Sequence, residues 1–460
     1  MPASPSLISA ATGSFTAEAF AAHLAAHASF PAWWLERKRA AYEKFAALPL
    51  PGRTDEAWRF STLTGLTLDG FVLSRGGEVL LPDPSGPLVL GHSSLVIPRS
   101  AELVFANNQL QTSTPPDKEL QQRGVIVTTL AVALRDHPEL LRAHFMAQPQ
   151  KLGSEKFAAL HTAFVGDGAF IYIPRGVAVP QPIVVTHLAS GAGTAVFPHT
   201  LVIAEENAKL TVVDHFVSAS DSGHSSLVIG PSGAAGNFAC GANDLYAGHG
   251  AQLTYLAAQN WSRDTLSFQF NSTVVRRDAR VQSLNLHLGA RQARHESLSQ
   301  LQAPGAFSEM LALTVAEGTQ EFDQRTLQIH QAPNTKSDLL YKNALRDQAR
   351  TIFSGLIVVD PDAQKTDAYQ SNRNLMLSDD AEACSLPGLE IQANDVRCTH
   401  GATSSRIDPE QEFYLQSRGI AKAAADELLT FGFFEQVLSR LASEPLHDAL
   451  RELIKTKFKK

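Results

Sequence analysis

The feature that most constrains the fold is a long middle stretch of short apolar runs, from about Phe164 to Leu389, in which helical periodicity is almost absent. Runs rich in Val, Ile, Leu, Tyr and Phe and bounded by turn residues are typical of β-strands. They include AFIYIP, PIVVTHL, HTLVIA, KLTVVDHF, QLTYLAA, VQSLNLHL and GLIVVD. Strands without intervening helices favour either a parallel β-helix or a large β-sandwich, and the pattern alone leaves both open.

A turn-like element recurs within this stretch and places an alanine just before an emerging strand. It occurs as ENAKLTVV at Glu206, GHGAQLTYL at Gly248, RRDARVQSL at Arg276 and RDQARTIF at Arg346. The spacing is irregular, so the element suggests successive coils of chain and does not define a clean repeat.

Helical patterns flank the strand-rich stretch on its N-terminal side. Apolar residues at helical spacing predict helices over Thr16 to His27 and Trp33 to Leu48. A further helical patch, Leu130 to Met146, is broken at His137, because a residue before proline is pushed away from helical geometry. We assign residues 1–155 to a helical and mixed N-terminal region and residues 156–405 to the strand-rich core.

Helices return after Arg406, and residues 406–460 form a C-terminal helical region. Asp408 before Pro409 is a helix-start signal, and Gly419 is a suitable left-handed residue at the end of that helix. A second helix is expected over Ala421 to Leu441. A third opens at Pro445 and ends in lysines expected to be solvated, namely Lys455, Lys457, Lys459 and Lys460.

Composition narrows the class of protein. A formal net charge of -7 and a pI near 6.1 provide no basic field for nucleic acid. Three cysteines, Cys240, Cys384 and Cys398, argue against a disulfide framework and for a reducing compartment. The first basic residue is Arg37, which does not fit a secretory signal, and the uncharged stretch 176–204 is interrupted by prolines and histidines. We expect a cytoplasmic protein without nucleic-acid or membrane partners.

The candidate chemistry lies in the extended segment NDVRCTHGA. Side chains two apart on a strand point to one face, so Cys398 and His400 share a face. A thiolate and an imidazole suit iron or zinc, but two ligands do not close a site, and further donors would have to come from elsewhere, such as a second chain. The alternative is that Cys398 is a packing residue. Cys384 lies in a turn-rich segment, where it either approaches the same edge or is an incidental core or loop cysteine. Cys240 is interpreted as an incidental core or loop cysteine.

Motifs for independent catalysis are absent from the sequence. There is no GxSxG elbow, no GxxxxGKS phosphate loop and no GxGxxG after a strand. The acidic pairs Asp379 with Asp380 and Asp360 with Asp362 are typical of solvated turns. We therefore expect a protein that is not an enzyme.

The run VRCTHGATSSRIDPEQEFYLQSRGI, from Val396 to Ile420, resembles the signature of the SufB/SufD family of iron-sulfur cluster assembly proteins. Further blocks similar to the family are TDAYQSNRNLMLSD at Thr366, APNTKSDLLYKNAL at Ala332, GDGAFIYIPRGVAVPQPI at Gly166 and RTDEAWRFSTL at Arg53. The resemblance covers nearly the whole chain.

Within the family, CTHGAT and the RTDEAWRFSTL block favour the SufD branch, whereas SSRI after Thr403 is closer to the SufB branch. In an ungapped comparison the sulfur-accepting cysteine of the SufB branch falls at Ala381. The acceptor role is therefore not transferred to Cys384.

The resemblance implies a right-handed parallel β-helix between helical terminal regions. It also implies a scaffold subunit of the SUF complex that pairs with SufB and binds the SufC ATPase through its C-terminal helices. The complex would take persulfide sulfur delivered by SufS and SufE. A nascent iron-sulfur cluster would form at the SufB-SufD interface, with His400, and with weaker support Cys398, as ligands. A reduced flavin bound by the complex and a homodimer of the isolated chain are further expectations. The alternatives are a SufB-like scaffold that itself accepts persulfide sulfur, or, by fold analogy alone, a β-helix carbohydrate-active protein.

Overall fold

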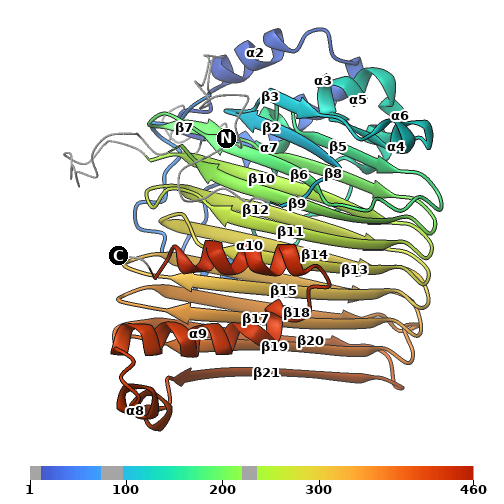
Figure 1. Cartoon of the computed structure of the whole chain (residues 1–460). Coiled ribbons are helices and arrows are strands. Elements are labelled where there is room, and N and C mark those ends of the chain that lie inside the picture. The colour runs from blue at the N-terminus through green and yellow to red at the C-terminus, as the bar shows by residue number, and fades with distance from the viewer. Residues whose placement is uncertain (1–11, 74–96, 220–235, 459–460) are drawn as a thin grey trace.

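The structure, a computed structural model, describes residues 12–73, 97–219 and 236–458. The described chain is mainly β, with a β-solenoid of about 8 turns between helical segments at its two ends (Figure 1). Successive coils place one strand in each of two sheets, and strands within a sheet pair in parallel. The parallel β-helix is thereby confirmed, and the β-sandwich is excluded because sandwich sheets are antiparallel.

One sheet, here called sheet A, has the strand order β20-β18-β16-β14-β12-β10-β8-β5-β4. The short strand β1 pairs with β7, which pairs with β10, and the pairing of β4 with β5 is antiparallel. The strands are β1 (Val72–Leu73), β4 (Ile126–Thr129), β5 (Ala169–Ile173), β7 (Thr194–Val196), β8 (His199–Ala204), β10 (Phe238–Ala247), β12 (Leu266–Val275), β14 (Gln292–Leu301), β16 (Glu321–His330), β18 (Arg350–Val359) and β20 (Glu382–Ile391).

The facing sheet, sheet B, has the order β21-β19-β17-β15-β13-β11-β9-β6-β2-β3, and only the β2–β3 pairing among these is antiparallel. Its strands are β2 (Ala101–Ala106), β3 (Gln109–Thr114), β6 (Ile183–Ala189), β9 (Lys209–Ser218), β11 (Gln252–Asn260), β13 (Arg280–His287), β15 (Phe307–Ala316), β17 (Lys336–Leu345), β19 (Asp367–Met376) and β21 (Arg397–Arg406). Each sheet therefore ends in an antiparallel pair at the N-terminal end and in a single long strand at the C-terminal end.

The recurring alanine motif forms the corners of the coils. A residue with positive φ is followed by a fully buried alanine that opens a strand of sheet B, as in Asn207-Ala208, Gly250-Ala251, Asp278-Ala279 and Gly305-Ala306. Glycine is required at Gly250 because a Cβ there would lie 2.2 Å from Oδ1 of Asn207 on the preceding coil. Ala349 instead opens a strand of sheet A. One cause of the irregular spacing is that the motif serves two different corners.

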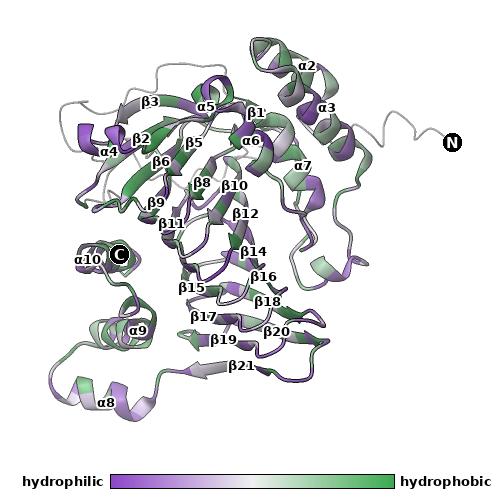
Figure 2. Ribbon diagram, turned by 90° about the vertical axis from the view of Figure 1, so that its right-hand side faces the viewer, coloured by the Kyte–Doolittle hydropathy of each residue, from purple (hydrophilic) through white to green (hydrophobic). Residues whose placement is uncertain are grey.

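The N-terminal helices pack on the outer face of sheet A (Figure 2). They are α2 (Ala17–Ala26), α3 (Ala32–Ala47), α5 (Leu130–Asp136), α6 (Pro138–His144) and α7 (Glu155–Phe164), with a 3₁₀ turn η1 (Glu56–Trp58). The short helix α4 (Lys118–Gln122) lies elsewhere, because its buried Leu120 joins the core cluster that contains Ile171 and Val185. The predicted helices over Thr16 to His27 and Trp33 to Leu48, and the break at His137, are confirmed. Thr16 caps α2 by accepting a hydrogen bond from the backbone of Ala19.

The C-terminal helices follow β21 and return along the outer face of sheet B (Figure 2). They are α8 (Pro409–Ser417), α9 (Lys422–Leu438) and α10 (Glu444–Lys455). Asp408 caps α8 by accepting from the backbone of Glu410, and Gly419 has φ of 83°, as the sequence predicted. The apolar residues of α9 and α10 complete one core with those on the outer face of sheet B.

The prediction that the terminal lysines are solvated is wrong for Lys457. Its Nζ lies 3.1 Å from Oε1 of Glu317, and both side chains are about nine-tenths buried. The short turn after α10 carries Lys457 back to the β15–β16 corner, so the lysine anchors the chain end to the solenoid. Lys459 and Lys460 lie outside the described residues.

Among the described residues, no helix is long and apolar enough to cross a membrane. The uncharged stretch 176–204 instead contributes β6, β7 and β8 to the two sheets.

Candidate functional site at the open end of the solenoid

The C-terminal coil leaves both sheets with an uncovered edge. We call this surface, formed by β20 and β21, the open end. Strands in the middle of the solenoid are almost entirely buried, whereas β20 is half-buried to exposed and β21 is mostly exposed. Edge strands present unpaired backbone N–H and C=O groups, and most proteins cover or interrupt them. No helix covers these two strands in the described structure (Figure 1).

Cys398 and His400 lie on β21 in the set of positions that faces the solenoid interior. Cys398 pairs with Ala368 of β19, and His400 pairs with Gln370. Cys398 packs against an interior cluster that contains Ile357 and Val359, so its side chain points toward the interior of the solenoid. Because alternate residues of a strand share a face, His400 lies on the same face of β21 as Cys398. The structure therefore brings the two predicted residues together at the rim of the open end.

The surroundings of the two side chains differ. Cys398 is half-buried, and burial raises the pKa of its thiol, with the nearby Asp367 carboxylate acting in the same direction. His400 is exposed. Beneath it, the fully buried Gln370 donates from Nε2 to the Gly355 carbonyl, 3.1 Å away, while its Oε1 has no partner in the described chain. A free acceptor under an imidazole can orient that ring through an N–H donor.

An amide network holds the two edge strands together behind this rim. Nδ2 of Asn374 lies 3.1 to 3.4 Å from side-chain or backbone oxygens of both sheets, including Ser385 of β20 and Ser404 of β21. Ser385 also donates to Oδ1 of Asn372 at 2.6 Å. Buried, multiply bonded amides of this kind rigidify their surroundings. The network therefore holds β21, the strand that carries Cys398 and His400, rigidly against its neighbours.

The described residues do not complete a metal site by themselves. No group of three or more His, Cys, Asp or Glu side chains suited to a metal ion occurs in the described part of the chain. Tetrahedral sites for iron or zinc need four donors, of which Cys398 and His400 supply two.

Cys384 belongs to the open end but not to this rim. It pairs with Ile352, on the set of β20 positions that faces away from the interior, whereas Ser385 faces inward. Its Sγ lies 3.7 Å from Oε1 of Glu382 on the outer face of sheet A. The hypothesis that Cys384 approaches Cys398 and His400 is therefore not supported by the geometry. Ala381 immediately precedes β20 and is partly buried.

Cys240 is a core residue, as the sequence indicated. It is fully buried under α7, its Sγ donates to the Phe157 carbonyl at 3.3 Å, and burial raises the pKa of its thiol well above the ordinary value. A buried neutral thiol is inert.

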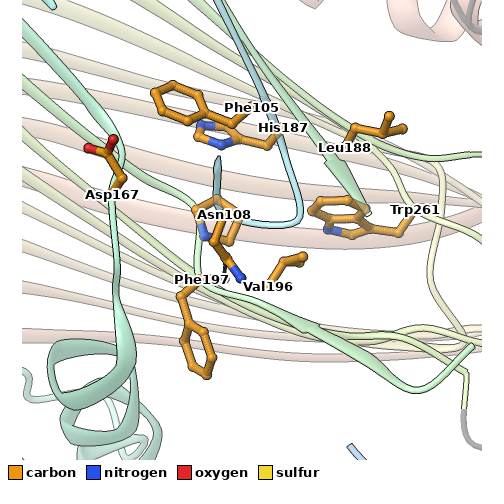
Figure 3. A pocket seen from close by; sticks show the side chains of 9 residues that line it. Phe105, Asn108, Asp167, His187, Leu188, Val196, Phe197 and Trp261 are labelled. Atoms are coloured by element: carbon orange, nitrogen blue, oxygen red, sulfur yellow. Dashed lines mark hydrogen bonds between the residues drawn. The ribbon is translucent and has the colours of Figure 1, made fainter. Parts of the chain in front are cut away.

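The opposite end of the solenoid is filled rather than open. A cavity of about 10 Å³ lies there, and its lining includes Phe105, His187 and Trp261 (Figure 3). The His187 ring stacks between Phe105 and Phe216, with centroids 5.4 and 5.3 Å away. A space of this size admits at most one water molecule. His187 therefore acts as a packing residue.

The RTDEAWRFSTL block has a structural role that sequence reasoning did not identify. It crosses the outer face of sheet A, where Trp58 lies 3.9 Å from the guanidinium of the buried Arg294. Arg294 donates to Glu296 at 2.8 Å and to Asp323 at 2.6 Å. Ser61 of the block donates to the same Asp323. The conspicuous block thus binds the N-terminal region to the solenoid through a buried ion network.

A second exposed surface lies beside the open end, on α8. This helix has no buried residue, and Phe413 and Tyr414 are 73% and 56% exposed. Leu428 of α9, 53% exposed, adds to the same apolar set. The rest of the C-terminal region is anchored, since Arg440 pairs with Glu309 at 2.8 Å and with Asp338 at 2.7 Å.

Comparisons with known proteins agree with this architecture. Residues 187–433 match the family described as "SUF system FeS cluster assembly, SufBD core domain", and residues 92–185 match "SufBD protein N-terminal region".

Individual relatives match over most of their length. The iron-sulfur cluster assembly protein SufD of Escherichia coli is 30% identical, with 86% of each chain covered. SufD of Bacillus subtilis is 29% identical over 93% of this chain and 95% of its own. A SufBD family protein of Synechocystis is 28% identical over 91% and 90%. The predicted resemblance is confirmed, and the chain belongs to the SufBD family of iron-sulfur cluster assembly proteins.

Proposed function

We propose that the chain is a scaffold subunit that supplies half of an iron-sulfur assembly site and is completed by a partner chain. The observation that carries the proposal is the position of Cys398 and His400 on the free edge strand of an uncovered solenoid end. Two soft donors at an unpaired edge, with no third ligand among the described residues, fit a cluster shared between two chains.

The proposed partner at the open end is the SufB paralogue. Free backbone groups on β20 and β21 offer a template for strands of another chain, so docking there would bring the partner's donors to the rim. Sulfur would reach the complex through SufS and SufE. A cluster that is later passed on benefits from ligands split across an interface, because separating the chains opens the site.

His400 and Cys398 would not contribute in the same way. The imidazole is exposed and can bind iron without moving other groups. The thiol is half-buried with a raised pKa, so it must lose its proton as the metal approaches. We therefore assign the primary ligand role to His400 and a supporting role to Cys398.

Binding of the SufC ATPase is proposed for α8 and the adjoining part of α9. Large apolar side chains gathered on an otherwise polar surface mark interaction sites. Phe413, Tyr414 and Leu428 form such a set, on a helix that directly follows the site-bearing strand β21. Movement of α8 on nucleotide binding would thus be transmitted to the open end through a connection of only Ile407 and Asp408.

The test is anaerobic reconstitution of the co-expressed complex with iron and sulfide, comparing wild type, His400→Ala and Thr399→Ala. Thr399 is the exposed neighbour on the opposite face of the same strand, so it controls for disturbance of β21. The proposal predicts that His400→Ala lowers the cluster absorbance and the maturation of a target protein, while Thr399→Ala leaves both at the wild-type level.

Equal cluster content and equal target maturation in the His400→Ala complex would refute the ligand role. Persulfide trapped on Cys384 during turnover would instead favour the SufB-like alternative, in which this chain itself accepts sulfur.

A further inference from the structure

A groove lies outside the solenoid between α2 and the strand β1, at the end of the molecule away from β20 and β21 (Figure 1). Its larger part has a volume of about 620 Å³. An adjoining part of about 290 Å³ shares His23, His27, Leu73 and Gln109 with it, so the two parts are continuous. Clefts of roughly 300 to 1,000 Å³ are the size in which proteins bind small organic molecules.

The walls of the larger part are apolar. Ala19, Ala22 and Ala26 line it from one face of α2, and Phe15 lies before the start of that helix. From β1 comes Val72, which is 64% exposed. No acidic or basic side chain occurs among the described residues that line this part. With 10 residues, α2 is about 15 Å long, which accommodates an acyl chain of medium length.

Two histidines one turn apart on α2 supply polar atoms to the groove. Nε2 of His23 lies 3.2 Å from Nζ of Lys38 and accepts from that ammonium, so the imidazole proton is on Nδ1. Nδ1 of His23 has no hydrogen-bond partner within the described ranges, and it offers the groove an N–H donor. Nδ1 of His27 donates to the His23 carbonyl at 2.8 Å, and its unprotonated Nε2 faces Gly166 of the smaller part.

Lys38, behind His23, is a buried cation without a counter-ion. Its side chain is almost fully buried, and Nζ also donates to the carbonyls of Ala163 at 3.1 Å and Val165 at 2.5 Å. Each of its three N–H groups therefore has an acceptor, but no carboxylate pairs with it in the described part of the chain. Burial lowers the pKa of Lys38 to about 7, and an anion bound nearby would stabilise its ammonium form. Hydrogen-bonded chains polarise one another, so the charge strengthens the Nδ1–H of His23 as a donor.

We propose that this groove binds a medium-chain carboxylate, with the carboxylate accepting from Nδ1 of His23 and the apolar chain lying along the alanine face of α2. The anionic head complements the unpaired charge of Lys38, whereas a cationic head would oppose it. The apolar walls suit a hydrocarbon tail and leave a second polar group without partners. The inference goes beyond the proposed function, because no residue of the groove belongs to β20, β21 or α8.

The test is calorimetric titration of the full chain with octanoate, 1-octanol and octylamine, which share a tail and differ in the charge of the head. We expect octanoate to bind roughly 10- to 100-fold more tightly than octanol, because hydrogen bonds to charged groups contribute more than neutral ones. Octylamine should bind most weakly. Ala22→Trp fills the groove and should abolish octanoate binding. The matched control is Ala25→Trp, since Ala25 is exposed on the same helix but does not line the groove.

Lys38→Met tests the contribution of the buried charge. Octanoate affinity should fall by roughly 10-fold while octanol affinity stays unchanged, which also shows that the groove is still formed. If this variant does not fold, the comparison of head groups and the Ala22→Trp pair decide. Absence of octanoate binding, equal affinities for octanoate and octanol, or undiminished binding by Ala22→Trp overturns the inference. None of these measurements involves iron, sulfide or a partner chain, so they leave the proposed function to its own test.

Discussion

The two ends of the solenoid are built in contrasting ways. At the N-terminal end each sheet finishes in an antiparallel pair, and helices α2, α3 and α7 bury an aromatic core against sheet A. At the C-terminal end two ten-residue strands stand uncovered, with polar and charged side chains. The contrast is the one that the proposed function requires: a closed end that stabilises the chain, and an open end left for a partner chain.

The largest expected effect is the loss of stability when an apolar side chain at the closed end is truncated, compared with the same kind of truncation at the open end. Phe164 lies with ring centroids 5.2 to 6.1 Å from five neighbouring rings at the closed end. Phe164→Ala should lower the free energy of unfolding by about 3–5 kcal/mol through lost burial and the cavity left behind. Leu386→Ala on β20, where the side chain is 37% exposed, should cost about 0.5 kcal/mol or less. Urea unfolding measures both, and similar losses would remove the contrast.

Acid should weaken the protein through histidines buried away from the open end. Burial lowers the pKa of His161 to about 4 and of His187 and His295 to about 3. Below about pH 6.5 these histidines bind protons in the unfolded chain but stay neutral in the folded chain. The free energy of unfolding therefore falls as the pH drops toward 4. Asp214 and Asp244, whose pKa burial raises to about 7, and Asp167, whose pKa burial raises to about 6, act with the opposite sign. Further buried histidines with lowered pKa are His199, His215, His287 and His330.

The seven histidines outnumber these three carboxylates, so the free energy of unfolding should fall by about 1.4 kcal/mol per pH unit for each net proton. Urea midpoints at pH 7 and pH 5 provide the check. A midpoint that rises on acidification would show that the carboxylates dominate.

A smaller loss of stability is expected when the ion pair that joins the end of the chain to the solenoid is removed. Lys457→Met removes the buried partner of Glu317 and should cost about 1–3 kcal/mol, because it leaves a charged acceptor with one fewer bond. Lys455→Met, on the same chain segment but in an exposed pair with Glu452, should cost about 0.5 kcal/mol or less. Equal costs would mean that the end of the chain is not anchored through Lys457.

The sequence predicted elements whose signals are local. The helix caps at Thr16 and Asp408, the break at His137 and the left-handed Gly419 depend on a few adjacent residues and are confirmed. The choice between β-helix and sandwich depends on which strands pair, which is not local, and it needed the family resemblance.

The site was predictable only in part for the same reason. The period of two along a strand placed Cys398 and His400 on one face, but the direction of that face depends on the pairing with β19. The sequence left open whether Cys384 approaches them, because the face on which it lies depends on its register with β18. Lys457 and the Arg294 network were missed because their partners lie far away in sequence.

The central claim is that a partner chain completes the open end along β21. Residue-resolved hydrogen exchange of the isolated chain and of its complex with the SufB paralogue tests it most directly. The N–H of Arg397 bonds to Thr366 toward β19, so the even-numbered residues of β21 direct their N–H and C=O groups outward. The account predicts that the outward amides of Cys398, His400, Ala402 and Ser404 exchange rapidly in the isolated chain and become protected in the complex. The amides of Thr399, Gly401 and Thr403, which face β19, should be protected in both. Rapid exchange of the outward amides in a fully formed complex would contradict the account.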